Sequence, residues 1–103
     1  MKLISIILIV AACFNQADSL ITADCQCNSI PLYGRVQVVE SHADFRVQIV
    51  THFEDIRVDT VDSFPDECGK WQIVTSSPDF TVVFVNSHAD FKIRYVNSFP
   101  GID

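Results

Sequence analysis

Glycine is scarce in this sequence, because a chain of 103 residues contains only Gly34, Gly69 and Gly101. Three isolated glycines exclude the glycine-rich loops with which nucleotide-binding proteins hold phosphate groups. No cofactor-binding motif is present, and no set of residues is arranged like a nucleophile with its base. The sequence therefore predicts no catalytic residue, no cofactor and no metal ligand.

Basic residues are also few: seven Lys and Arg stand against 13 Asp and Glu, which gives a net charge of −6. They are spread along the chain and do not cluster at one end: Arg35, Arg46, Arg57, Lys70 and Lys92 each stand apart. An acidic chain without a basic patch is a poor ligand for phosphate-rich surfaces. Nucleic acid and anionic membrane surfaces are therefore excluded as expected partners.

Long apolar runs are absent except near the N-terminus. One lysine precedes the apolar run 3–12, and small and polar residues follow it, which is the form of a secretory signal peptide. A retained membrane anchor needs roughly 20 apolar residues, whereas Asn15 and Asp18 interrupt this run early. We predict a signal peptide over residues 1–19, with cleavage after Ala23 as the alternative, and hence a secreted, extracellular protein without a membrane span.

A repeat of eleven residues fills the stretch from Gly34 to Gly101. It occurs six times, with Cys68 and Gly69 inserted in the fourth copy: GRVQVVESHAD, FRVQIVTHFED, IRVDTVDSFPD, E(CG)KWQIVTSSPD, FTVVFVNSHAD and FKIRYVNSFPG. The halves 34–66 and 69–101 also align without gaps. Related tetrapeptides at 28–31, 62–65 and 97–100 indicate a seventh unit split between the two ends. We expect a leader with a Cys-x-Cys motif over 20–33 and one repeat domain over 34–103.

Positions one to five of the repeat alternate between apolar and mostly polar residues, and the apolar ones are β-branched or aromatic. Such alternation is typical of a half-buried β-strand. The remaining positions are rich in Ser, Pro and Asp, which form turns. No room is left for a helix, so the predicted fold is all-β, with short strands and turns in pseudo-symmetric repetition.

Position six is valine in every unit and breaks the alternation, because it falls on the same pleat face as positions two and four. A bulge or a bend would explain it, and we favour a bend that turns these valines into a shared interior. Trp71 replaces a small apolar residue at position three and is expected to fill space where the halves join rather than to mark a binding surface. The predicted core is Val39, Val50, Val61, Trp71, Val74, Val85 and Val96.

Position eleven is aspartate in five units: Asp44, Asp55, Asp66, Asp79 and Asp90. Aspartate and serine hydrogen-bond nearby backbone, so these residues are predicted to shape the turns. A ladder of calcium sites is the alternative, but calcium needs several oxygens that converge on one point. Because the aspartates belong to separate units, we prefer the structural role.

The three histidines occupy the same part of the repeat, with His42 and His88 at position nine and His52 at position eight. A metal ligand or a general base is conceivable, but position nine also holds Phe and Ser, which indicates an ordinary, partly buried side chain. Ser-His-Ala-Asp at 41–44 and 87–90 contains the residue types of a catalytic triad. Four contiguous turn residues cannot adopt the geometry of a triad.

Three cysteines remain after removal of the signal peptide: Cys25, Cys27 and Cys68. In an oxidising compartment the simplest pairing joins Cys68 to Cys25 or to Cys27 and leaves one thiol unpaired or linked to a partner. The protein is then a monomer unless this thiol links two chains. A zinc site made from these cysteines and a histidine is the alternative, although C-x-C is not the usual zinc spacing.

The units FRVQIVTHFED, FTVVFVNSHAD and FKIRYVNSFPG, with Cys-Gly-Lys-Trp between the halves, resemble the septoil-knot domain family over about 28–103. The resemblance implies a chain that winds twice around a common ring as a seven-crossing torus knot. General topology rules alone would favour a small β-solenoid or barrel. Glu54, Glu67 and Gly101 depart from the family pattern, and the family supplies no catalytic residues.

Two classes of function follow. The first, which we prefer, is a non-enzymatic, secreted scaffold or binding module with an extracellular partner, for example a protein. The second is a secreted hydrolase or metal-dependent enzyme that uses the repeated Asp and His positions. The sequence identifies neither the partner nor the biological role.

Overall fold

The computed structural model describes residues 20–102, so the predicted signal peptide lies outside the described residues. Two short strands, β1 (Gln26–Cys27) and β2 (Ile30–Pro31), pair in an antiparallel ladder ahead of the repeat. Each unit then contributes one strand: β3 (Gly34–Val38), β4 (Phe45–Ile49), β5 (Ile56–Thr60), β6 (Lys70–Ile73), β7 (Phe80–Phe84) and β8 (Phe91–Tyr95). Residues 20–102 contain no helix, which confirms the all-β prediction, and so no helix there is long enough to cross a membrane.

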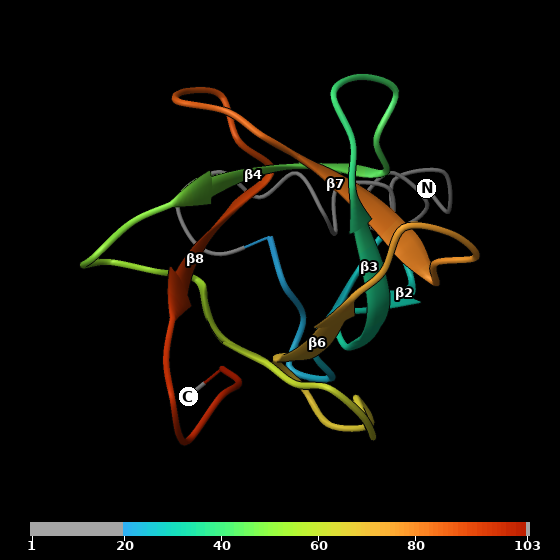
Figure 1. Cartoon of the computed structure of the whole chain (residues 1–103). Helices are drawn as coiled ribbons and strands as arrows, with labels where there is room; N and C mark the ends of the chain where they lie inside the picture. Colours follow the sequence, from blue (N-terminus) through green and yellow to red (C-terminus); the bar gives the residue numbers. More distant parts are fainter. Residues whose placement is uncertain (1–19, 103) are drawn as a thin grey trace, which may run out of the picture.

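The six repeat strands close into a barrel in which every neighbouring pair is parallel (Figure 1). Their order around the barrel is β3-β6-β5-β8-β4-β7. Strands that follow one another in the chain are mostly not neighbours: β7 lies between β3 and β4, β8 between β4 and β5, β3 between β6 and β7, and β4 between β7 and β8. The chain therefore skips one place at each step and goes around the barrel twice.

The exception is the pair β5 and β6, which are neighbours but share only a short ladder at Asp59 and Thr60. Below that ladder Gly101 bridges to Arg57 of β5, and the carbonyl of Leu32 accepts a hydrogen bond from Gly69 N at 3.2 Å. The two ends of the described chain thus fill a seventh place between β5 and β6. Six units with a split seventh are confirmed, and a path of seven places taken two at a time is that of a seven-crossing torus knot.

The strand register arranges the inward side chains in layers. In five of the six units, the residue at repeat position three pairs with position one of a neighbouring strand, as Val36 does with Phe80 and Val47 with Phe91. Because this displacement repeats around the barrel, equal repeat positions lie at about the same height. Positions one and three supply the fully buried interior: Val36, Phe45, Val47, Ile56, Val58, Trp71, Phe80, Val82, Phe91 and Ile93.

Aromatic rings dominate the inner layers. Phe45 packs edge-to-face against Phe80 and Phe91, with ring centroids 5.7 and 5.3 Å apart, and Trp71 packs against Phe80 at 5.6 Å. Trp71 is fully buried, and its Nε1 donates a hydrogen bond to the carbonyl of Leu32 at 3.1 Å. The ring therefore contributes large apolar area without leaving its polar atom unpaired.

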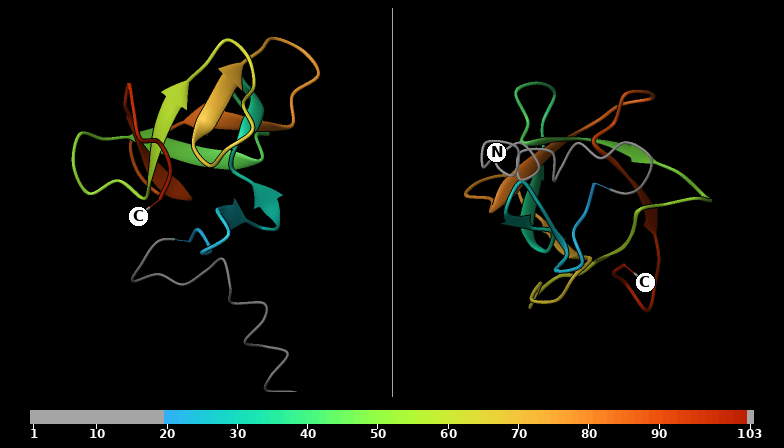
Figure 2. Two further views of the ribbon diagram at one scale, coloured as in Figure 1. Left: turned by 90° about the horizontal axis from the view of Figure 1, so that it is seen from below. Right: turned by 180° about the vertical axis from the view of Figure 1, so that it is seen from behind.

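The N-terminal segment closes the end of the barrel at which the strands begin. Figure 2 (left) shows this segment, in blue, beneath the strands. Its side chains Leu32, Cys25 and Cys27 are buried in the same cluster as the barrel interior. Gly69 is required here, because a Cβ at that position, with φ of 86°, would overlap the backbone of Arg57 and Gly101.

The valines of position six do not lie in the core, which corrects the sequence prediction. All six (Val39, Val50, Val61, Val74, Val85 and Val96) are only half-buried. Regular pairing continues through this position, since Val39 N donates to the carbonyl of Val82 at 2.8 Å and Val50 N donates to that of Ile93 at 2.8 Å. The hydrogen bonds of the ladder thus continue through position six, although the side chains there are only partly covered.

Candidate binding surface

The repeated aspartates fasten each corner, by which we mean repeat positions seven to eleven, to a neighbouring strand. Asp79 Oδ2 accepts a hydrogen bond from Arg35 N at 2.8 Å, and Asp79 N donates to the Arg35 carbonyl at 2.7 Å. Comparable bonds join Asp55 to Lys92, Asp90 to Arg46 and Asp44 to Thr81. The partner is the backbone of repeat position two, so these carboxylates are engaged in holding the fold.

Asp66 departs from this pattern, because Cys68 and Gly69 are inserted just after it. Its backbone N donates to the carbonyl of Phe64 at 2.8 Å, and its exposed carboxylate makes no hydrogen bond within residues 20–102. In the last unit Gly101 replaces aspartate and bonds to the backbone of Arg57 through both its N and its carbonyl.

The histidines do not come together. His42, His52 and His88 are exposed at three different corners. His52 and His88 contact the hydroxyl groups of their chain neighbours Thr51 and Ser87, and the ring of His52 also lies 6.4 Å from that of Phe53 between centroids. Over residues 20–102, no three His, Cys, Asp or Glu side chains lie close enough to hold a metal ion.

Cys25 and Cys68 form a disulfide with Cα atoms 5.9 Å apart, which ties the N-terminal segment to the insertion between the halves. Cys27 is disulfide-bonded as well. The unpaired thiol expected from the sequence is therefore not found among the described residues.

Position nine of every unit has a left-handed backbone, with φ between 53° and 63°: His42, Phe53, Phe64, Ser77, His88 and Phe99. Residues other than glycine seldom adopt this conformation, and for a bulky side chain it is strained. Each corner therefore places one side chain on a tightly turned tip. Glycine or asparagine would adopt the backbone conformation of this tip with less strain.

Three of these tips carry phenylalanine, and all three side chains are almost fully exposed: Phe53 by 91%, Phe64 by 79% and Phe99 by 83%. This exposure corrects the interpretation of position nine as an ordinary, partly buried site. The sequence does indicate this exposure, because turn-forming residues flank position nine on both sides and predict an exposed residue there. A large aromatic ring at such a place loses the stabilisation that burial would give it.

The three phenylalanines lie on consecutive corners of the barrel. The corner that carries Phe53 connects β4 to β5 and passes over β8, which lies between them. The corner that carries Phe99 follows β8 and passes over β5. The corner that carries Phe64 connects β5 to β6 and passes over the seventh place. Figure 1 shows these corners in succession along the left and lower edge, in light green, red and yellow. We call them the aromatic corners. The other three, with His42, Ser77 and His88, follow one another along the remaining edge, and we call them the polar corners.

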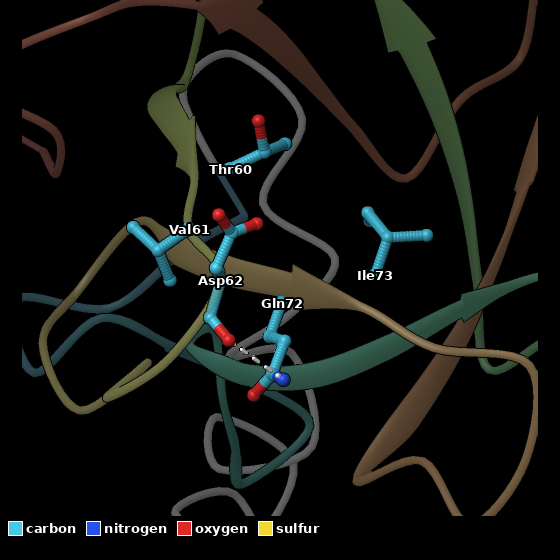
Figure 3. Close-up of a pocket in the computed structure, with 5 residues that line it drawn as sticks. All are labelled: Thr60, Val61, Asp62, Gln72 and Ile73. Atoms are coloured by element: carbon cyan, nitrogen blue, oxygen red, sulfur yellow. Dashed lines mark hydrogen bonds between the residues drawn. The ribbon is translucent and has the colours of Figure 1, made fainter.

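The end of the barrel opposite the N-terminal segment is rimmed by position five, where Val38, Ile49, Ile73, Phe84 and Tyr95 are 38–47% exposed. Partial burial raises the pKa of the Tyr95 hydroxyl. Between β5 and β6 this rim contains a depression of about 320 Å³ lined by Thr60, Val61, Asp62, Gln72 and Ile73 (Figure 3). The depression adjoins the corner that carries Phe64, because Asp62 precedes that residue by two positions.

Three of the four cations near the aromatic corners are engaged, whereas the side chain of Lys92, whose backbone bonds to Asp55, has no ion pair within residues 20–102. Arg94 pairs with Glu54 at 3.0 Å, and Lys70 pairs with Glu67 at 3.3 Å. Arg57 Nε donates to the carbonyl of Phe99 at 2.9 Å. The hydrogen bond from Arg94 lowers the pKa of the Glu54 carboxyl.

Three carboxylates of the same region have no such partner. No ion pair or side-chain hydrogen bond engages the carboxylates of Asp59, Asp62 and Asp66 within residues 20–102. The aromatic corners are therefore bordered by uncompensated negative charge.

The family model of the 7(1) septoil knot domain matches residues 29–103, which is most of the chain and all six strands of the barrel. No curated protein matches the sequence.

Proposed function

We propose that this chain, which belongs to the 7(1) septoil knot domain family, is a non-enzymatic, secreted binding module. Its contact surface is formed by the aromatic corners. The observation that carries the proposal is the exposure of Phe53, Phe64 and Phe99, at 79–91%, on adjoining corners. Exposed aromatic side chains that gather on one side of a small protein are typical of interaction sites.

The positions of these rings favour a functional origin over a structural one. A phenylalanine at a left-handed tip strains the backbone and buries little apolar area. The same backbone conformation is built with His42, Ser77 and His88 on the polar corners, so the fold does not depend on an aromatic ring at position nine. What the rings add is a surface that a partner can cover.

The alternative of a hydrolase or metal-dependent enzyme has less support. The aspartates that it would use bond to strand backbone at four of five positions, and the histidines lie on separate corners. His52 and His88 each lie within hydrogen-bond reach of a hydroxyl group, but each pair is exposed on its own corner and no third group that would orient the imidazole hydrogen-bonds to it in residues 20–102.

The test uses two variants with matched backbone chemistry. The aromatic variant carries Phe53→Asn, Phe64→Asn and Phe99→Asn, and the polar-corner variant carries His42→Asn, Ser77→Asn and His88→Asn. Asparagine is accepted in the left-handed region, so both proteins should fold. Immobilised wild type and variants are each incubated with extracellular fluid of the source organism, and bound proteins are identified by mass spectrometry.

We expect a partner that wild type and the polar-corner variant retain and that the aromatic variant loses, with Kd raised at least tenfold, because aromatic anchors dominate many interfaces. Equal retention by all three proteins would overturn the assignment of the surface. Hydrolysis of generic ester, glycoside or phosphoester probes by wild type that the polar-corner variant lacks would favour the enzymatic alternative.

A further inference from the structure

We infer that the partner of the aromatic corners is a basic polypeptide that places a lysine or arginine side chain in the depression between β5 and β6. This inference rests on the proposed function and adds the chemistry of the partner. It is carried by three features that adjoin one another at the corner of Phe64: that exposed ring, the depression and the uncompensated carboxylates.

The depression has the two surfaces that a long basic side chain needs. Val61 and Ile73 offer apolar walls, along which the methylene stem of lysine or arginine can pack. Asp62 offers the charge: its backbone carbonyl accepts a hydrogen bond from Gln72 Nε2 at 3.1 Å, whereas its carboxylate makes none. Figure 3 shows that carboxylate turned toward Thr60, away from the bond to Gln72.

The unpaired charge on β5 and on the corner that follows it is negative. Asp59, Asp62 and Asp66 contribute it, while Arg57, Lys70 and Arg94 already have partners; Lys92, whose side chain has no ion pair within residues 20–102, lies on β8 beside the corner of Phe53. On the polar corners all three position-eleven aspartates, Asp44, Asp79 and Asp90, accept hydrogen bonds from strand backbone, whereas among the aromatic corners only Asp55 does so. Complementary charge at the rim of an interface speeds association and selects the partner.

The exposed rings favour the same ligand. A guanidinium or ammonium group is attracted to the face of an aromatic ring, and the attraction adds to that of nearby carboxylates. Rings and carboxylates together select a cation that is carried on an apolar stem. A second copy of this chain or an anionic membrane does not fit, because the chain itself has a net charge of −6.

The experiment measures binding of two synthetic peptides of about 16 residues by fluorescence anisotropy. One is built from Lys, Leu and Trp, and the other has Glu in place of each Lys. The protein variants are Asp62→Asn and, as control, Glu40→Gln. Glu40 occupies the same repeat position as Asp62, on a polar corner, and is likewise exposed. Vesicles of zwitterionic lipid serve as a third probe.

We expect wild type to bind the Lys peptide and not the Glu peptide. Asp62→Asn should weaken binding about three- to fivefold, the range of an exposed charge pair, and Glu40→Gln should leave it unchanged. The combined replacement of Asp59, Asp62 and Asp66 by asparagine should weaken it about tenfold or more and should reduce its dependence on salt.

Failure of this inference can be told apart from failure of the proposed function. If the aromatic variant loses a natural partner but wild type ignores the Lys peptide, the surface stands and the basic partner is overturned. The same conclusion follows if Asp62→Asn and Glu40→Gln weaken binding of the Lys peptide equally. Binding to zwitterionic vesicles that depends on the three phenylalanines, without binding to either peptide, would assign the rings to a membrane and would also overturn the inference.

Discussion

The aromatic and the polar corners share one backbone and present opposite chemistry. Both sets turn through a left-handed residue with φ between 53° and 63°, and both begin from a strand with the same inward layers. One set exposes three phenylalanines, and only Asp55 of its aspartates bonds to strand backbone; the other exposes two histidines and a serine, and all three of its aspartates make such bonds. The difference shows which repeat positions form the barrel and which are available to contact a partner.

Positions one and three are inside, and position eleven fastens the corner at four of six units. Position nine contributes no contact on which the barrel depends, since Phe, His and Ser all occur there with the same backbone. In a repeat protein, the residue at such a position can differ between units on one side of the barrel while the other positions of the repeat stay the same. The comparison therefore separates residues that specify the fold from residues that are available for binding.

The largest effect is expected from the interior that both sets of corners share. Val58→Asp places a charge in a fully buried layer, and the cost of an unpaired buried charge, several kcal/mol, should prevent folding. Val61→Asp, three residues later in the same unit, affects a half-buried side chain and should cost roughly 1–2 kcal/mol. Circular dichroism and urea unfolding distinguish the two. Similar losses at both sites would show that position six belongs to the core.

The next effect concerns the seventh place, where the aromatic side of the barrel is joined to the N-terminal segment. Replacing Cys25 and Cys68 together by serine removes a cross-link between residues 43 apart. The loss of this constraint should lower the free energy of unfolding by about 2–4 kcal/mol. Urea unfolding of the variant and of wild type measures it, and an unchanged midpoint would contradict the role given to this disulfide.

A smaller effect on the free energy of unfolding is expected to differ between an aspartate of the polar corners and one of the aromatic corners. Asp79→Ala removes the acceptor for Arg35 N and should cost about 1–2 kcal/mol. Asp66→Ala removes a carboxylate without a hydrogen bond and should change stability by less than about 0.5 kcal/mol. Thermal unfolding of both variants provides the comparison. An equal cost at the two sites would mean that the corner at Phe64 is fastened like the others.

The smallest effect has the opposite sign. Phe64→Asn should relieve strain at a left-handed tip and raise stability by about 0.5–1 kcal/mol, because asparagine accepts this backbone more readily. A gain in stability together with a loss of binding is the signature of a residue kept for function. Urea unfolding at several temperatures provides the measurement. A destabilised variant would show that the ring supports its corner after all.

Much of the architecture could be predicted from the sequence because the repeat is explicit. The number of units, the strands, the absence of helix in the described chain and the split seventh unit all follow from spacing. The position of the valines could not be predicted correctly. An apolar residue in every unit suggests burial, whereas here the backbone of Val39 and its equivalents continues the pairing while their side chains are only half-covered.

The candidate site was harder to predict, for a physical reason. A periodic pattern identifies the residues on which the fold depends. The phenylalanines at the tips of the corners are not part of such a pattern, because the fold does not depend on them. The sequence places Phe53, Phe64 and Phe99 in turns but not side by side, because only the skipping order of the strands makes their corners consecutive. The depression near Asp62 likewise forms from β5 and β6, which come together at the closure of the split unit.

The central claim is that the aromatic corners receive the partner, and chemical-shift mapping tests it most directly. Isotope-labelled wild type is titrated with the captured partner while the amide signals of residues 20–102 are followed. The account predicts the largest shifts in the corners around Phe53, Phe64 and Phe99 and in Asp62, with the signals around His42, Ser77 and His88 unmoved. Shifts concentrated on the polar corners, or spread evenly over all six, would contradict it.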